Sequence, residues 1–393
     1  MQKLNLGVFG FGCVGQGLHF AFKQNSNVNT SLKKIVVKDK NKKRMLAAKY
    51  FSFDKKEILN DENINVVVEL IDNANEAYEI VKEAIVNGKH VVTANKKMLA
   101  THLAELIALK NKHNVSLLYE AAACGSIPII RTLENYFSNE DLIKISGIFN
   151  GTTNYILTKV IDEGLTYEQA LQNAQQSGFA ETDPTSDVEG FDALYKTIII
   201  AMHGFGIILQ VNDVFRFGIS SLQFKDIDFA KRNGYKIKLV PTITKLSDNK
   251  INAFVMPQFV KSDNHLFKVE NEFNGVLIES ATSGEQFLLG RGAGSLSTGA
   301  AVFSDIAALE NNYSYENKKL QQSKLLFTND FAVNVFISAK NKTDIEKITF
   351  EKTISVFEED GYSYKIGVVK IEALKQQVEK RKLRGNVFIA VID

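Results

Sequence analysis

Cysteine is scarce in this 393-residue chain, which contains only Cys13 and Cys124. Two cysteines cannot build a disulfide framework, and they fit a protein of a reducing compartment. The six histidines are scattered and lack the spacing to cysteines or carboxylates that is typical of zinc ligands. The sequence therefore predicts a cytoplasmic protein with no disulfide framework and no metal site built from side chains.

Long apolar runs and an excess of charge are missing as well. No stretch reaches about 18 consecutive apolar residues, the length that a membrane-spanning helix needs. The apolar run at residues 4–9 is too short for a signal peptide and leads into a glycine-rich loop. The formal net charge is only +2, which argues against nucleic acid or an acidic membrane as the main partner. We expect neither among the partners.

Apolar sequence is plentiful, at 45% of residues, and the length predicts more than one domain. In the first third, apolar strands at residues 64–71, 90–93 and 115–119 alternate with helical patterns at 76–87 and 97–112. Continuous apolar strands are typical of parallel sheets that are buried on both faces. The alternation predicts a doubly wound α/β domain of the Rossmann type, with its ligand crevice at the carboxyl ends of the strands.

A glycine loop marks the start of this domain. Residues 4–9 form an apolar strand, Gly10-Phe-Gly-Cys-Val-Gly15 follows it, and a helical pattern continues to about Gln24. Gly10 permits the tight turn, Gly12 lets the backbone approach a pyrophosphate, and Gly15 lets the helix pack close to the strand. The phosphates would meet free N–H groups at the helix N-terminus, which includes Cys13 and Val14. This arrangement predicts a dinucleotide site.

The second strand, at residues 34–37, is followed by groups of both charges. Asp39 stands near the place where an acidic side chain binds a ribose 2′-hydroxyl. Lys38 and the basic group at residues 42–44 could instead neutralise a 2′-phosphate, and a lysine-rich surface loop is the ordinary alternative. We lean slightly to NADPH over NADH as the cofactor and leave both open.

After the first domain the pattern changes to helices followed by consecutive strands. Helices are expected from Pro128 to about 136, from 151 to about 163, and after a capping box at residues 166–169. The expected strands are 236–243, 251–260, 276–279 and 287–289. We predict three parts: a Rossmann domain at 1–125, completed by a helix at about 296–320; an α+β catalytic and dimerisation domain at 126–295; and a small C-terminal α/β module at 325–393.

Residues 181–196 carry the most informative chemistry. Glu181, Asp183 and Asp187 lie on a turn-forming segment, and Asp192 and Lys196 follow four residues apart at the start of an apolar helix. That spacing places the last two side chains on one helix face. An ammonium with acidic neighbours beside a buried helix can bind a zwitterionic substrate and move a proton. An ordinary salt bridge after a solvated loop is the alternative.

The ordered motifs resemble the homoserine dehydrogenase family, in the form without a fused aspartate kinase. The resemblance covers roughly residues 4–310. Its motifs are the glycine loop, Thr93-Ala-Asn-Lys96, Tyr119-Glu-Ala-Ala-Ala-Cys-Gly-Ser-Ile-Pro128, Asn150-Gly-Thr-Thr-Asn154, residues 178–196, and Gly290-Arg-Gly-Ala-Gly294. The resemblance implies reduction of L-aspartate 4-semialdehyde to L-homoserine with NADPH or NADH, a branch step toward threonine, methionine and isoleucine.

The same resemblance implies a role for particular residues. Lys196 is the expected general acid, Asp192 orients the substrate and the lysine, and Lys96 is the second functional lysine, reaching both nicotinamide and substrate. Glu181 and Asp187 are expected to hold the substrate amino group. The remaining implied contacts are Gly178 to the substrate, and Asn73 and Gly294 to the cofactor.

The segment 120–127 resembles the monovalent-cation loop of the family. Main-chain carbonyls of Glu120, Ala123, Gly125 and Ile127 would bind Na⁺ or K⁺, because carbonyl oxygens are hard ligands. A plain βα-loop is the alternative. The family resemblance also implies a homodimer. Residues 325–393 contain no proline, so the Pro-Gly turn of the regulatory domain in many relatives is absent and threonine feedback is not assumed.

Two other functions compete with this interpretation. A thiol-dependent aldehyde dehydrogenase would use Cys124 as its nucleophile, but no histidine base stands in a comparable strand-end motif apart from His203. A non-catalytic NAD(P)H sensor would carry the same glycine loop. Neither alternative gives the Asp192–Lys196 pair a role.

Overall fold

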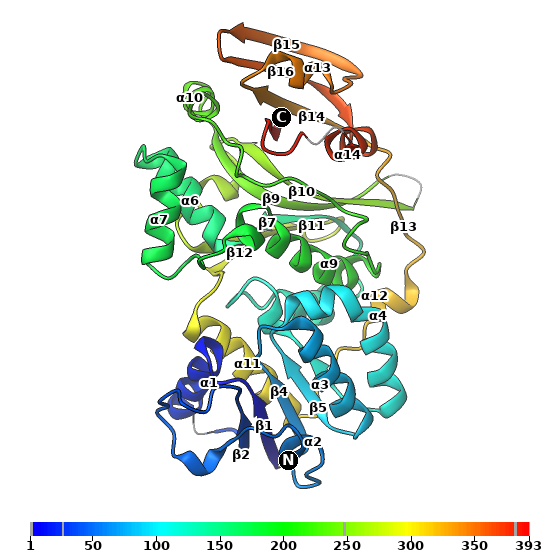
Figure 1. The fold of residues 1–393 in the computed structure, drawn as a ribbon. Coiled ribbons are helices and arrows are strands. Elements are labelled where there is room, and N and C mark those ends of the chain that lie inside the picture. Colours follow the sequence, from blue (N-terminus) through cyan, green and yellow to red (C-terminus); the bar gives the residue numbers. More distant parts are fainter. Residues whose placement is uncertain (1–2, 26, 247–248, 381–382, 393) are drawn as a thin grey trace. The chain divides into compact units, whose positions relative to one another are not determined.

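The computed structural model describes residues 3–25, 27–246, 249–380 and 383–392. The chain divides into two compact units, which we describe separately (Figure 1). Unit 1 comprises residues 1–138 and 293–321, and unit 2 comprises residues 139–292 and 322–393. Among the described residues, no helix is both long enough and apolar enough to cross a bilayer.

Unit 1 is built on a six-stranded parallel sheet with the strand order β3-β2-β1-β4-β5-β6. Its strands are β1 (Leu4–Phe9), β2 (Thr30–Val36), β3 (Phe51–Ser52), β4 (Val66–Glu69), β5 (His90–Thr93) and β6 (Leu117–Leu118). Its helices are α1 (Cys13–Gln24), α2 (Lys56–Leu59), α3 (Ala74–Val86), α4 (Lys96–His113), α5 (Ile129–Arg131) and α11 (Ser295–Leu309). This order confirms the predicted doubly wound fold.

Local sequence explains how the strands and helices of unit 1 begin and end. All four residues of β4 are buried, as expected for a central strand that is covered on both faces. Asn73 and Asn95 cap α3 and α4, each accepting a backbone N–H with its side-chain oxygen. The helix predicted from Pro128 to about 136 is instead two short pieces, α5 and a π-helical turn at Thr132–Tyr136.

Unit 2 is built on an 11-stranded mixed sheet with the main order β12-β11-β7-β9-β10-β17-β14-β16-β15, and with β8 and β13 paired to β10. Its strands are β7 (Leu142–Ile148), β8 (Phe215–Arg216), β9 (Lys236–Lys245), β10 (Lys250–Val260), β11 (Phe273–Ser280), β12 (Gly284–Arg291), β13 (Leu326–Phe327), β14 (Ala332–Ala339), β15 (Lys352–Glu359), β16 (Tyr362–Lys370) and β17 (Val387–Ile392). The hairpin of β9 and β10, paired over ten residues, forms its centre.

Four helices of unit 2 follow one another between β7 and β8, and the others lie between later strands. The helices are α6 (Gly151–Asp162), α7 (Tyr167–Gln176), α8 (Thr185–Val188), α9 (Phe191–Phe205), α10 (Phe224–Arg232), α13 (Lys342–Glu346) and α14 (Ile371–Lys380). A short helix, α12 (Lys318–Gln322), stands where the chain passes from unit 1 to unit 2. The capping box predicted at residues 166–169 is present, with Thr166 as the N-cap of α7.

The last strands of the chain join the same sheet as the middle of the chain. All six residues of β17 are buried, and this strand pairs with β10 on one side and β14 on the other. Val335, Ile337 and Val387 share an apolar cluster with Phe254 and Met256 of β10. Strands β14 to β17 therefore belong to the sheet of unit 2, within the region that the sequence predicted as a small C-terminal module.

Candidate active site

A buried ion pair lies at the start of α9 in unit 2. Gly190 begins the helix with a φ of +79°, which favours glycine. Asp192 lies in the first turn and Lys196 one turn later, and their side chains are only 5% and 8% exposed. Lys196 Nζ donates to Asp192 Oδ2 at 2.7 Å. The i,i+4 spacing thus gives a desolvated pair, in which each charge interacts far more strongly than it would in water.

Lys196 is also bonded to the backbone. Its Nζ donates to the carbonyl oxygen of Phe149 at 2.6 Å, and Asn274 Nδ2 donates to the same oxygen at 3.1 Å. An ammonium group carries three protons. Within the described residues two of them are used, so one N–H of Lys196 is available to a ligand.

Asn150, at the N-cap of α6, joins this pair to a second carboxylate. Its Nδ2 donates to Asp192 Oδ2 and to Asp187 Oδ1, each at 2.7 Å. Asp187 lies on α8, so a single amide connects two helices. Sequence reasoning placed Asn150 in a family motif and gave it no role, because its partners are 37 and 42 residues away.

The other predicted substrate residues are more exposed. Glu181 is exposed, and its backbone carbonyl accepts Gln175 Nε2 at 3.0 Å. Gly178 has a φ of +75°, and no atom would contact a Cβ added there. Asp183 Oδ1 accepts the N–H of Thr185 at 3.1 Å, and bonds from Thr185 lower the pKa of this exposed carboxyl. The carboxylate of Asp183 therefore stabilises the turn in which it lies, while the carboxylate of Asp187 accepts a hydrogen bond from Asn150.

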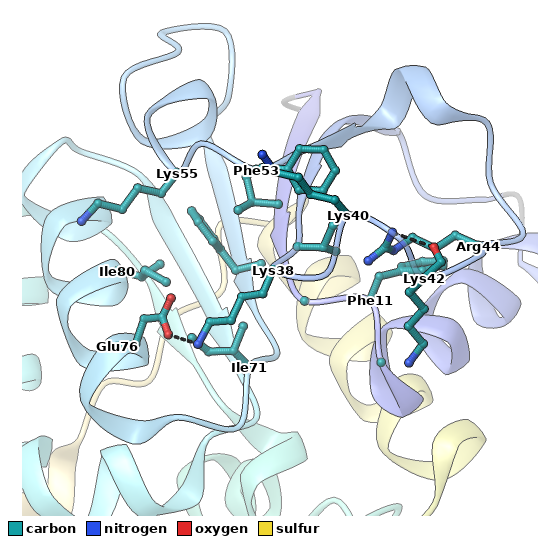
Figure 2. Close-up of a pocket in the computed structure, with 15 residues that line it drawn as sticks. Phe11, Lys38, Lys40, Lys42, Arg44, Phe53, Lys55, Ile71, Glu76 and Ile80 are labelled. Carbon is teal, nitrogen blue, oxygen red and sulfur yellow. Dashed lines mark hydrogen bonds and ion pairs between the residues drawn. The ribbon is translucent and has the colours of Figure 1, made fainter.

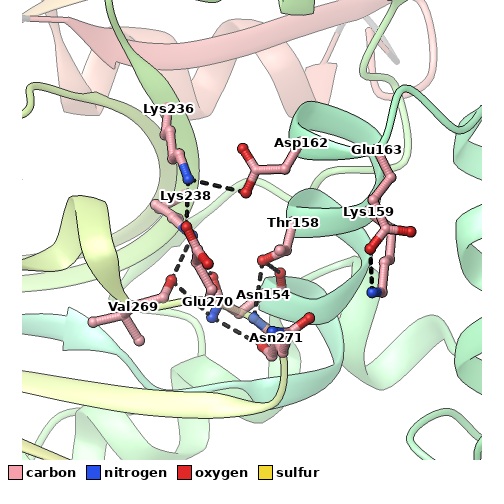
Figure 3. Close-up of polar contacts among 10 residues, drawn as sticks. All are labelled: Asn154, Thr158, Lys159, Asp162, Glu163, Lys236, Lys238, Val269, Glu270 and Asn271. Atoms are coloured by element: carbon pink, nitrogen blue, oxygen red, sulfur yellow. Dashed lines mark hydrogen bonds and ion pairs between the residues drawn. The ribbon is translucent and has the colours of Figure 1, made fainter.

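A second buried lysine, Lys238, helps to hold the segment at residues 269–273 beside α6 (Figure 3). Lys238 Nζ, on β9, donates to Asn154 Oδ1 at 2.9 Å and to the carbonyl of Val269 at 2.6 Å. Asn154 Nδ2 in turn reaches the carbonyls of Val269, Asn271 and Phe273. Burial, and then the nearby charge of Lys236, lowers the pKa of Lys238 to about 8. These bonds hold the segment that carries Asn274 against α6.

Unit 1 has a pocket of about 560 Å³ at the carboxyl ends of β1 and β2 (Figure 2). Its cationic lining comprises Lys38, Lys40, Lys42, Arg44 and Lys55, and Glu76 is its acidic residue. Lys38 Nζ pairs with Glu76 at 2.5 Å. Arg44 donates to the carbonyls of Lys42 and Asp39 and so braces the loop. The excess of cations suits a ligand that carries several negative charges.

The glycine loop forms the floor of this pocket. Gly10 has a φ of +95°, and a Cβ there would lie 2.7 Å from the carbonyl oxygen of Leu70. Gly12 is the N-cap of α1 without a side-chain cap, and nothing lies within 4 Å of the Cβ position. A Cβ at Gly15 would lie 2.9 Å from the carbonyl oxygen of Gly10. The open N-terminus of α1, with Cys13 and Val14 in its first turn, fits a pyrophosphate.

Gly294 reaches this loop from the far end of the chain. Ser295 Oγ donates to the carbonyl of Cys13 at 2.6 Å, so the N-terminus of α11 lies beside that of α1. Gly294, the N-cap of α11, has a φ of +121°. Gly17 and Gly299 make the approach possible, since a Cβ at Gly17 would lie 1.8 Å from the carbonyl oxygen of Ser295. Two helix N-termini thus lie side by side.

Asp39 does not line the pocket. Its Oδ1 accepts the N–H groups of Asn41 and Lys42 at 2.8 and 3.2 Å. Such bonds close a local turn. The geometry therefore gives no support to Asp39 as a ribose ligand, and the pocket presents Lys38, Lys40 and Lys42 instead.

Lys96 is the first residue of α4 and follows a buried carboxyl network. Thr93 Oγ1 donates to Glu69 Oε2 at 2.6 Å, and the N–H of Ile71 donates to Glu69 Oε1 at 2.6 Å. Burial raises the pKa of Glu69 to about 7, although both of these bonds oppose the rise. Asn95, which is bonded to Thr93 and to the carbonyl of Ile71, caps α4. The network fixes the loop that carries Lys96.

The predicted cation loop forms a tight buried turn. Glu120, Ala123, Gly125 and Ile127 all lie in it, and Cys124 and Gly125 have φ values of +51° and +63°. The carbonyls of Glu120 and Ile127 already accept backbone N–H groups. The side chain of Glu120 points elsewhere, accepting the N–H groups of Ile130 and Arg131 at 2.8 and 2.9 Å. The turn gathers the four residues, and any ligation would use main-chain oxygens.

Cys124 is fully buried in this turn. A thiol nucleophile needs access to its substrate. The thiol-dependent alternative therefore has no support at its proposed nucleophile.

Within the described residues, no group of three or more His, Cys, Asp or Glu side chains could hold a metal ion.

The fold and the pocket together define a class. A parallel sheet with this strand order, a glycine loop at its switch point and a basic pocket at its strand ends is the architecture of a dinucleotide-binding protein of the Rossmann type.

Comparison with known proteins makes the class specific. Residues 128–307 match the family model described as homoserine dehydrogenase, and residues 10–120 match the model described as its NAD binding domain. The homoserine dehydrogenase of Bacillus subtilis is 35% identical over 380 residues, spanning 93% of this chain and 87% of that protein. The Lactococcus lactis enzyme is 38% identical, over 78% and 74% of the two chains. The chain belongs to the homoserine dehydrogenase family.

Solved structures agree with this assignment. The crystal structure of a homoserine dehydrogenase from Thiobacillus denitrificans superposes with a TM-score of 0.86 and 27% identity, covering 100% of this chain and 99% of that one. A hyperthermophilic archaeal homoserine dehydrogenase in complex with NADPH has a TM-score of 0.69 and 27% identity, covering 80% and 99%. The protein is thus an oxidoreductase with a nicotinamide cofactor, and the thiol-dependent and sensor alternatives are not supported.

Proposed function

We propose that the protein reduces L-aspartate 4-semialdehyde to L-homoserine, with Lys196 as the proton donor. The observation that carries the proposal is the buried cluster of Lys196, Asp192 and Asn150, in which one N–H of the lysine has no partner within the described residues.

A bound nicotinamide supplies the hydride that reduces the aldehyde carbon. As the C–H bond forms, the carbonyl π electrons move to oxygen, and the developing alkoxide needs a proton or a fixed cation. Lys196 gives its remaining proton to that oxygen, becomes a neutral amine and regains a proton from solvent. Asp192 and the carbonyl of Phe149 accept the other two N–H bonds of Lys196 and hold its nitrogen in place before and after the transfer.

The substrate is recognised through its charges. Its ammonium group faces the carboxylates of Asp187 and Glu181, with Gly178 allowing close approach of the backbone. Lys96 provides a second cation for the substrate and the nicotinamide amide. Gly10, Gly12, Gly15 and Gly294 would hold the cofactor, with Asn73 at the start of α3 as a further contact. In this scheme unit 1 binds the cofactor and unit 2 binds the substrate.

The cationic pocket favours NADPH over NADH. A 2′-phosphate would add about two negative charges. Lys38, Lys40 and Lys42 line the pocket and would neutralise them, whereas Asp39 does not line it. Steady-state assays with both cofactors and in both directions test the function and the preference together. NADPH oxidation that does not depend on added aspartate semialdehyde, or no turnover at all, would remove the proposal.

Three further features belong to this proposal. The carbonyls of Glu120, Ala123, Gly125 and Ile127 bind Na⁺ or K⁺, which predicts that activity in a bulky organic-cation buffer rises when KCl or NaCl is added.

The protein is a homodimer, which sedimentation at micromolar concentration would detect. It acts in the cytoplasm, without nucleic acid as a partner, which fractionation and a DNA-binding assay would test.

A further inference from the structure

We propose that Asn150 is a positioning residue that couples recognition of the substrate amino group to the proton donor. It does so by holding Asp187 and Asp192 on one amide nitrogen. The inference rests on the proposed roles of Asp187 and Lys196 and goes beyond them, because it concerns how the two are linked.

The orientation of the Asn150 amide is fixed by its chemistry. The N–H of Thr153 donates to Asn150 Oδ1 at 2.7 Å, and a backbone N–H can only donate. The atom that faces Thr153 is therefore the amide oxygen, and the –NH₂ group faces the carboxylates. Both of its protons are used, one for Asp187 Oδ1 and one for Asp192 Oδ2. Asn150 is 4% exposed as a whole residue, so water hardly competes for these hydrogen bonds.

This arrangement offsets a repulsion. Asp187 Oδ1 and Asp192 Oδ2 both accept a hydrogen bond from Asn150 Nδ2. The distance between these two oxygens is therefore at most twice 2.7 Å. Two carboxylates at that separation disfavour each other's ionised form. The donated protons stabilise both charges, and Lys196 neutralises one of them from the other side of Asp192 Oδ2.

Residues 149 and 150 contact both ends of the ion pair. The carbonyl of Phe149 accepts from the lysine, and the side chain of Asn150 donates to the aspartate. A shift of Asp187 on binding an ammonium group is therefore transmitted to Asp192 and Lys196 through one rigid amide. The N-cap of α6 keeps that amide in place.

Serine at position 150 separates the coupling from helix capping. Serine caps a helix about as well as asparagine but has no –NH₂ group. Asn150→Ser should keep the protein folded and lose the bridge, and Asn150→Asp should keep the cap and add a third carboxylate. Asn264→Ser is a matched control, because Asn264 caps a short helix of unit 2 through the N–H of Leu266 and touches no carboxylate.

The decisive measurement compares two aldehydes. Succinate semialdehyde lacks the amino group of aspartate semialdehyde, so the ratio of their kcat/KM values reports amino-group recognition. We expect Asn150→Ser to lower kcat for aspartate semialdehyde at least tenfold and to reduce this ratio at least tenfold, with larger losses for Asn150→Asp. The acidic limb of the kcat/KM profile should move to higher pH, because carboxylates that lose a donor bind a proton more readily. Asn264→Ser should match the wild type.

The outcomes separate the two proposals. A wild-type protein without turnover would refute the proposed function, and NMR titration of the Asp187 and Asp192 carboxylates would still test the bridge through a higher midpoint in Asn150→Ser. An active wild type whose Asn150→Ser variant keeps kcat, the aldehyde ratio and the pH limb would overturn the inference. A variant that loses kcat but keeps both the ratio and the limb would also overturn it, because that pattern fits a local packing defect without any coupling.

Discussion

The cations that line the pocket of unit 1 and the two buried lysines at the centre of unit 2 are held in opposite ways. The pocket lysines of unit 1, Lys38, Lys40 and Lys42, are exposed, and Lys38 makes one surface ion pair with Glu76. In unit 2, Lys196 and Lys238 are buried, and each donates to two acceptors within 2.9 Å. The first set is screened by water and salt, while the second is almost free of both.

The difference in burial suggests that the exposed pocket lysines and the buried lysines have different functions. Exposed charges add small, nearly independent amounts of free energy to the binding of an anion, and salt weakens them. A buried ammonium in a hydrogen-bonded network has one position and one set of partners, so its loss affects the whole network. We infer that the unit 1 cations set affinity in a graded way and that the unit 2 cluster sets chemistry almost completely.

The largest effect is expected for Lys196→Met. Removing the proton donor should lower kcat by about 10²- to 10⁴-fold, the usual contribution of general acid catalysis. NADPH affinity, measured by fluorescence titration, should stay within twofold, because the cofactor pocket lies in the other unit. Lys236→Met is the matched control: Lys236 pairs with Asp162 and Glu270 at 2.9 and 2.6 Å but lies outside the cluster. Equal kcat losses in both variants would contradict the assignment.

Glu69→Gln tests whether unit 1 also contains a buried charge with a large effect. The folded pKa of Glu69 is about 7, against an ordinary value of 4.5, chiefly because of burial. Between these values the folded protein keeps a proton that the unfolded chain has lost, so this residue lowers stability as pH rises. The variant should gain roughly 3 kcal/mol over the wild type between pH 4.5 and pH 8. Urea unfolding at several pH values measures the difference, and a pH-independent difference would refute it.

Lys238→Met should destabilise the protein by about 2 kcal/mol, because Asn154 Oδ1 and the carbonyl of Val269 lose a buried donor. The folded pKa of about 8 lies below the ordinary 10.5. Wild-type stability from this residue should therefore rise between pH 8 and pH 10.5, and the deficit of the variant should grow. Lys159→Met removes an ion pair with the exposed Glu163 and a contact with the Tyr155 ring, and it should cost at most about 1 kcal/mol. Similar costs for both lysines would weaken the contrast between buried and exposed cations.

The smallest effect is expected in the pocket. Lys42→Ala should raise the Kd for NADPH about tenfold at low salt and leave that for NADH nearly unchanged, an effect of about 1.4 kcal/mol. Lys43→Ala is the control, because Lys43 is exposed and does not line the pocket. The difference between the two variants should shrink as ionic strength rises. If the difference in Kd between the two variants does not change with ionic strength, Lys42 acts through a buried contact and not through a screened surface charge.

Sequence patterns predicted the local parts of this site well. The strand β1 and the helix start after Gly12 follow from an apolar run that ends in three spaced glycines. The face shared by Asp192 and Lys196 follows from i,i+4 spacing, and the cap of α7 follows from Thr166 and Gln169. Each depends on residues within one turn or one strand of each other, where backbone geometry alone decides the contact.

Other features depended on contacts between distant residues. Nothing near Lys238 indicated that a lysine in a strand would be buried and would donate to Asn154 and Val269, 84 and 31 residues away. The insertion of β17 between β10 and β14 joins the end of the chain to the central sheet, which no periodicity within residues 325–393 could predict.

The sequence by itself determined the secondary structure near its glycines and caps, the family, and which charged residues stand one helical turn apart. Tertiary structure alone decided that Asn150 bridges Asp187 and Asp192 and that Ser295 brings Gly294 to the glycine loop. The physical reason is range. Backbone dihedrals and capping are set by neighbours along the chain, whereas desolvation and hydrogen bonds between helices exist only after packing has excluded water.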